Sequence, residues 1–171
     1  MRHDEEMEAE VARVVDLVEA TRERLGDLLP AVPGETLVVL HPTTAQLMLA
    51  QPALPAIHLA TAPAARRYLV GWVARGRFDV LAGAALADRS SGGEGSRDLL
   101  RLSPAALYAQ LALAASASHW PPPFRPAPLA RAARWAWLWL GAGPWLSGQL
   151  AFARPAIARR LREGSRPAFP P

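Results

Sequence analysis

Apolar residues recur every three or four positions through the first thirty residues, with acidic residues between them. This spacing puts an apolar stripe along one side of a helix and predicts an amphipathic helix over residues 1–30. Pro30 and Pro33 follow the stripe and end the pattern, because proline disrupts a helix interior. The stripe consists of Met7, Val11, Val14, Val15, Val18, Leu25, Leu28 and Leu29.

Short apolar and β-branched runs replace the helical spacing after residue 35. Residues 36–40 predict a strand, and the residues after it have the spacing of a capping box, with Thr43 at the N-cap and Gln46 three positions on. A short helix is expected there. Residues 57–61 predict a second short strand between prolines.

Two alternating runs within residues 67–81 predict a β-hairpin, since three residues ending in Gly76 join them. Asp79 is the single carboxylate on the second run. Strand alternation predicts that it faces solvent or pairs with Arg67 across the hairpin.

Helical spacing returns after the hairpin, beyond a flexible loop over residues 89–96. The Ser103-Pro104 pair is typical of a helix start, so the helix predicted over residues 98–116 can divide there. Further helices are expected at residues 84–88, 129–140, 144–153 and 155–163.

Strands flanked by helices predict an α+β fold, a small mixed or antiparallel sheet with a hairpin at about 67–81, packed against several helices. We divide the chain into an N-terminal amphipathic helix (1–30), a single α+β domain (35–164) and a proline-rich tail (165–171).

All 19 basic residues are arginine, and their distribution is uneven. Residues 1–30 hold nine acids and four arginines, whereas the remainder holds fifteen arginines and six acids. A basic body can attract nucleic acid, but these arginines are scattered among apolar segments instead of forming one patch. Nucleic acid is therefore not the expected partner.

The N-terminus is acidic and lacks the pattern of a secretory signal, so a cytoplasmic protein is expected. Residues 102–124 and 135–153 carry no charge and are long enough to raise the question of a membrane span. Prolines, glycines and polar residues interrupt both, which favours buried helices over insertion. Contact with a membrane surface through the tryptophans remains a variant.

The residue types that carry common catalytic chemistry are sparse. There is no cysteine, no Gly-x-Ser-x-Gly motif and no pair of histidines at helical spacing. His41 and His58 fall on neighbouring predicted strands, yet two imidazoles alone make a poor zinc site. The clustered tryptophans fit core packing better than a groove: Trp135, Trp137, Trp139 and Trp145.

The order of elements is more informative than any one motif. A strand ending at His41-Pro42, a hairpin, a loop and a helix over residues 107–113 are followed by Pro-Trp-Leu-Ser-Gly-Gln-Leu-Ala at residues 144–151. This layout resembles the small single-domain zinc metallopeptidases of the gluzincin type, which are zincin-like. In that family one helix carries His-Glu-x-x-His, and the next carries a Trp-Leu-x-Glu-Gly-x-Ala pattern with the third zinc ligand.

The resemblance implies a site without its reactive groups. Ala109 and Leu113 stand in place of the two histidines, Gln110 replaces the glutamate, and Gly148 replaces the third ligand. Alanine, leucine and glycine side chains cannot bind zinc, and glutamine cannot act as a general base. We therefore expect no metal, no cofactor and no catalytic residue, and predict a pseudo-metallopeptidase that binds a protein or peptide partner.

The resemblance also implies a cleft between the two sheet-facing helices, where an extended peptide could bind along an edge strand. The residues expected to line that cleft are Tyr108, Gln110, Trp145 and Gln149.

Two other classes of function stay open. An enzyme could use His41, His58 or His119 with a metal brought by a partner or substrate. Alternatively, the tryptophan- and arginine-rich C-terminal helices could bind a membrane surface or a partner protein.

Overall fold

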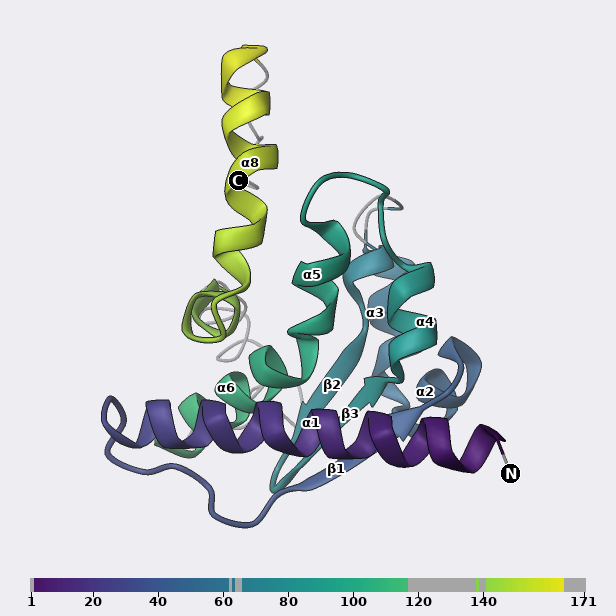
Figure 1. Ribbon diagram of the computed structural model, residues 1–171, viewed down its shortest axis with the longest axis vertical. Coiled ribbons are helices and arrows are strands. Elements are labelled where there is room, and N and C mark those ends of the chain that lie inside the picture. Colours follow the sequence, from purple (N-terminus) through teal and green to yellow (C-terminus); the bar gives the residue numbers. More distant parts are fainter. Residues whose placement is uncertain (1, 62, 64–65, 117–137, 139–140, 165–171) are drawn as a thin grey trace.

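The computed structural model describes residues 2–61, 63, 66–116, 138 and 141–164, which form a mixed α+β fold as predicted (Figure 1). A small sheet is packed between helices. The elements are α1 (Arg2–Gly26), β1 (Leu37–His41), α2 (Thr44–Ala50), α3 (Ala53–Ala60), the 3₁₀ helix η1 (Arg66–Tyr68), β2 (Gly71–Ala74), β3 (Arg77–Leu81), α4 (Gly83–Asp88), α5 (Ser96–Arg101), α6 (Ser103–Ser116) and α8 (Gln149–Arg162).

The sheet has the strand order β1-β3-β2. β1 runs parallel to β3 with Leu37 beside Arg77, and β2 runs antiparallel to β3 with Ala74 beside Arg77. A two-residue turn therefore closes the hairpin, one residue shorter than the sequence pattern suggested. Gly76 lies in this turn with φ 68°, a left-handed conformation that glycine adopts without strain. β3 is central, and β1 and β2 are the two edges of the described sheet.

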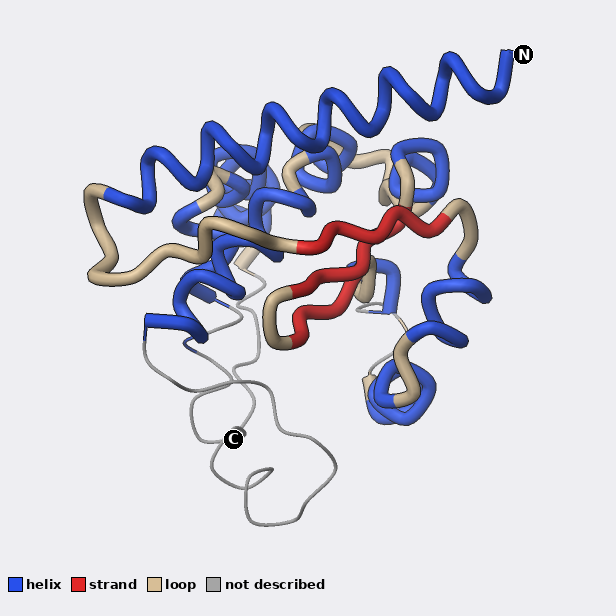
Figure 2. Tube along the Cα trace, turned by 90° about the horizontal axis from the view of Figure 1, so that it is seen from below, coloured by secondary structure: helices blue, strands red, loops and turns tan. Residues whose placement is uncertain are grey.

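One face of the sheet packs against α1 and α6. Figure 2 shows α1 spanning the width of the molecule on one side of the strands. Alternate strand residues such as Phe78 and Val80 meet Val14 and Val18 of α1 and the apolar side chains of α6, for example Leu111. α1 therefore shares its core with the α+β domain.

The other face of the sheet is covered by the short helices that follow β1 and β3. Leu81 packs there with Leu47 of α2, Leu54 of α3, Leu86 of α4 and Leu100 of α5. Because successive strand residues alternate between faces, Asp79 lies on this second, covered face with Leu81. Both faces of a three-stranded sheet are thus buried.

Several local predictions are confirmed. Thr43 is the N-cap of α2, where its Oγ1 accepts a hydrogen bond from the Gln46 N–H at 3.2 Å. The predicted helical turn after the hairpin is α4. The helix expected over residues 98–116 divides into α5 and α6 at the Ser103-Pro104 pair.

The strand predicted for residues 57–61 is wrong, because this segment belongs to α3. Pro52 occupies its N-cap and Pro55 lies in its first turn, where a missing backbone N–H costs no helical hydrogen bond. The first hairpin strand also begins at Gly71 and not at Arg67, since η1 occupies residues 66–68.

The C-terminal helix boundaries differ from those predicted. Residues 141–146 are helical, Gly148 turns the chain with φ 82°, and α8 continues through Pro155 without ending there. The helix expected at 129–140, apart from residue 138, the triple proline at 121–123 and the tail at 165–171 lie outside the described residues. None of the described helices combines the length and apolar character needed to span a membrane.

Candidate functional site

Three residues of α6 occupy the overlaid motif positions, which are those that correspond to His-Glu-x-x-His in the metallopeptidases, and all three are apolar or neutral. Ala109 is fully buried in the core shared with α1, while Gln110 and Leu113 are half-buried. α6 is buried on most sides, and alanine and leucine occupy nine of its fourteen positions. The helix therefore acts as a central support beneath the sheet.

The segment that follows the 117–140 stretch crosses α6 at Gln110. A Cβ on Gly143 would lie 2.8 Å from Gln110 Cγ and 3.0 Å from the Ala106 carbonyl oxygen, so glycine is what allows this close approach. Leu146 packs against the same core. α6 thus meets this segment at Gln110 and Gly143, one residue before the pattern at residues 144–151, and Gly148 lies five residues beyond Gly143.

Two of the four residues expected to line the cleft are held by hydrogen bonds to the backbone. Tyr108 is buried and donates its hydroxyl to the Pro33 carbonyl at 2.7 Å, while Gln149 donates from Nε2 to the Leu99 carbonyl at 2.8 Å. Burial also raises the pKa of the Tyr108 phenol, which keeps it a donor. Trp145, by contrast, is 67% exposed.

Replacing Tyr108 with phenylalanine is expected to lower the free energy of unfolding by about 1 kcal/mol, since it leaves the Pro33 carbonyl without its donor. Urea unfolding measures the change. Tyr68→Phe is the matched control, because that ring is half-exposed and its loss of a hydroxyl should change nothing. Equal effects in both variants would contradict a specific bond.

A second group of polar side chains, missed by the sequence analysis, lies on the covered face of the sheet. The Asp79 side chain is fully buried and accepts four hydrogen bonds from three side chains. Oδ1 accepts from His41 Nε2 at 2.8 Å and from an Arg77 terminal nitrogen at 2.6 Å. Oδ2 accepts from Gln51 Nε2 at 2.6 Å and from Arg77 Nε at 2.8 Å.

This Asp79 cluster corrects both expectations for that residue. Asp79 does not face solvent, because α2, α3 and the segment between them cover its side of the sheet. It does not pair with Arg67, because Arg77, two positions earlier on the same strand, holds it with a two-pronged contact. The signal that could have revealed it is the i, i+2 spacing, which puts Arg77 and Asp79 on one face.

The arrangement keeps Asp79 ionised. Burial alone raises the pKa of a carboxyl group, but the hydrogen bonds from Arg77 and His41 and the charge of Arg77 outweigh burial and hold the pKa of Asp79 below its ordinary 3.8. All of its strong acceptor positions are used by the protein. We therefore assign the cluster a structural role, joining β1, β3 and the α2–α3 junction.

The other chemistry-bearing residues do not gather into one site. His58 lies on α3, so the idea that it neighbours His41 on an adjacent strand is wrong. His119, Trp135, Trp137 and Trp139 lie outside the described residues. Across the part of the chain that the structure describes, no group of three histidine, aspartate or glutamate side chains could hold a metal ion. Comparison with known protein families, with curated proteins and with solved structures finds no match for this chain.

Proposed function

We propose that this chain is a non-catalytic, zincin-like domain that binds an extended peptide along the edge of β2. The proposal rests on one observation: β2 ends the described sheet, so its outward backbone groups meet no further strand there. An extended peptide can add to such an edge through main-chain hydrogen bonds.

The pairing of β2 with β3 identifies which groups are available. The Leu81 N–H donates to the Val70 carbonyl at 2.9 Å, and Trp72 lies opposite Asp79. In an antiparallel pair, alternate residues direct both backbone groups toward the partner strand. Val70 and Trp72 therefore bond to β3, whereas Gly71 and Val73 present their N–H and C=O groups to the outer edge.

The position of β2 on α6 is also fixed by close packing. A Cβ at residue 71 would collide with Leu107 of α6 and lie 2.5 Å from the Asp79 carbonyl oxygen. Glycine at this position lets the edge strand lie directly against the helix that carries Ala109 and Gln110. A bound peptide would add to the edge of a strand that this helix holds in place.

The residue types at the overlaid positions support binding without hydrolysis. Zinc hydrolysis requires three protein ligands and a base near the attacking water. Ala109, Leu113 and Gly148 have no atom that binds zinc, and the Gln110 amide does not accept a proton at neutral pH. The inactive assignment depends on this chemistry and on the resemblance together.

The test uses the full chain and a displayed library of random octapeptides. Selected peptides are expected to slow amide hydrogen exchange at Gly71 and Val73 at least about tenfold, because both amides gain a partner. The other sheet edge is an internal control. Since Leu37 N–H and the His41 carbonyl bond toward β3 and its continuation, Val38 and Leu40 face outward from β1, and their exchange should not change.

Three outcomes would contradict the proposal. Protection at Val38 and Leu40 instead of Gly71 and Val73 would put the peptide on the wrong edge. Failure to select any peptide from the library would contradict the proposed peptide binding. Stoichiometric zinc in the purified protein, with peptide cleavage that a chelator abolishes, would overturn the non-catalytic assignment.

A further inference from the structure

The C-terminal helix α8 leaves the body of the protein after its first turn. Its start is anchored to α5, where Gln149 bonds to the Leu99 carbonyl and the Phe152 backbone lies against Gly95. From Arg154 to Gly164 every residue is exposed. Figure 1 shows this part of the helix extending away from α5 and the other described elements.

The exposed part of α8 combines an apolar stripe with a strong positive charge. Steps of 100° per residue put Leu150, Ile157 and Leu161 on one side, and these side chains are 40%, 47% and 58% exposed. The same steps put Arg160 and Arg162 on the two flanks of the stripe, Arg154 beside it and Arg159 on the opposite side, and Glu163 is the one acidic residue between residues 141 and 164.

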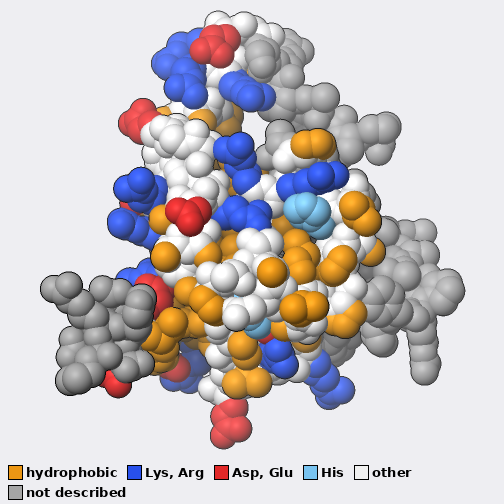
Figure 3. All heavy atoms as spheres, turned by 90° about the vertical axis from the view of Figure 1, so that its right-hand side faces the viewer, with side chains coloured by type: hydrophobic (Ala, Val, Ile, Leu, Met, Phe, Trp, Pro, Cys, Tyr) orange, Lys and Arg blue, Asp and Glu red, His pale blue; other side chains and the backbone are white. Residues whose placement is uncertain are grey.

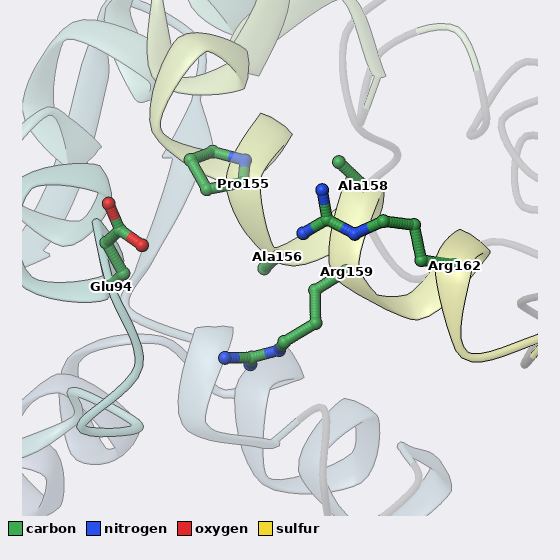
Figure 4. A pocket seen from close by; sticks show the side chains of 6 residues that line it. All are labelled: Glu94, Pro155, Ala156, Ala158, Arg159 and Arg162. Carbon is green, nitrogen blue, oxygen red and sulfur yellow. The ribbon is translucent and has the colours of Figure 1, made fainter.

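The charge reaches the junction with the loop before α5. Arg159 and Arg162 lie on one side of a shallow hollow of about 280 Å³, and Glu94 lies on the other side (Figure 4). Figure 3 shows basic side chains, with an acidic one among them, at the end of the molecule where α8 terminates. Glu94 and Glu163 offset only part of the charge of the four arginines, which leaves the rest available to an outside partner.

A helix of this kind needs a surface to cover it. Isolated helices of this length are marginal in water, and clustered arginines on one short helix repel each other. A stabilising partner must bury Ile157 and Leu161 and supply negative charge around them. An anionic lipid surface does both, because it offers an apolar layer beneath a sheet of negative headgroups.

We propose that α8 is a membrane-surface helix that lies in the headgroup region of an anionic bilayer, with its apolar stripe facing the lipid. Trp145, two-thirds exposed just before α8, suits the same interface. The alternative partner is a second copy of the chain, whose acidic helix α1 would contact the arginines of α8. We favour lipid because arginines flank the apolar stripe on both sides, the arrangement of a helix whose apolar side enters the lipid while its cationic side chains reach the headgroups.

Flotation of the full chain with vesicles tests this inference. Vesicles of phosphatidylcholine and phosphatidylserine are expected to bind the protein at low salt and release it at high salt, whereas phosphatidylcholine alone should bind it weakly. Arg160→Gln should weaken binding about fivefold, the effect expected for one arginine near a charged surface, because Arg160 flanks the apolar stripe.

A pair of matched variants separates the contribution of the apolar stripe to vesicle binding from the contribution of charge. Ile157→Glu and Ala156→Glu add the same charge at neighbouring exposed positions, so both should fold normally. Ile157→Glu should bind about tenfold more weakly than Ala156→Glu, because it also removes the apolar group that enters the lipid.

The outcomes that would overturn the inference are distinct. Equal binding of the two glutamate variants would exclude insertion of the stripe, and failure of the wild-type chain to bind anionic vesicles at low salt would exclude the membrane. Sedimentation showing a dimer that Ile157→Glu dissociates, without vesicles, would assign the stripe to a second copy of the chain.

Discussion

Asp79→Ala is expected to lower the free energy of unfolding by about 3 kcal/mol, because it leaves three donors facing the space of a buried carboxylate. The Arg77 side chain is 37% exposed and can turn toward water, which limits the loss. His41 and Gln51 are more enclosed and keep most of the penalty. Urea unfolding followed by circular dichroism measures the change.

The matched control for this substitution is Asp98→Ala. Asp98 is half-exposed and meets Arg101 at 3.5 Å, so its loss should cost no more than about 0.5 kcal/mol. A loss at Asp79 as small as that at Asp98 would contradict the structural role of the Asp79 cluster.

The pH dependence of stability supplies a second readout for the same residue. Burial opposes ionisation of Asp79, but hydrogen bonds from Arg77 and His41 lower its pKa below the ordinary 3.8. The pKa of Asp79 is lower in the folded than in the unfolded protein. The stabilisation that ionised Asp79 contributes is therefore fully present above the unfolded-state pKa and is lost as pH falls through the folded-state pKa. The stability difference between wild type and Asp79→Ala should therefore shrink below about pH 4.

Local signals in the sequence were sufficient where the physics is local. The Thr43 cap, the Gly76 turn and the Ser103-Pro104 helix start each depend on a few neighbouring residues, and the structure has all three. The hairpin followed from strand alternation. These features need no knowledge of what packs against them.

The errors arose where distant segments decide the outcome. Residues 57–61 are apolar enough for a strand, but most of them lie in α3, which buries Leu54 against the covered face of the sheet. Asp79 was expected to face water because a single strand does not reveal that α2 and α3 cover its second face. Separate helices were expected at 144–153 and 155–163, yet α8 continues through Pro155.

The candidate site was predictable only as a set of residue types. The sequence identified Ala109, Gln110, Leu113 and Gly148 as neutral positions, but not that Tyr108 would be held by Pro33 or Gln149 by Leu99. Those bonds join residues 75 and 50 positions apart, a separation that no local pattern encodes.

Gly71→Ala is expected to destabilise the fold by about 2 to 3 kcal/mol, the upper range for inserting a methyl group into a packed interior. The new Cβ would meet Leu107 and lie 2.5 Å from the Asp79 carbonyl oxygen, which belongs to the central strand. The Leu107 side chain can turn away, but the carbonyl can move only with β3. β2 must therefore lift from α6 or loosen its pairing with β3, and either change also disturbs the proposed peptide edge.

The control is Gly34→Ala, because a Cβ at residue 34 would meet nothing within 4 Å and its backbone is not left-handed. That substitution should be neutral or stabilise slightly by restricting the unfolded chain. Thermal and urea unfolding compare the two variants with wild type. If Gly71→Ala unfolds at the same denaturant concentration as Gly34→Ala, β2 does not lie directly on α6, and the edge available to a peptide is not the one assigned here.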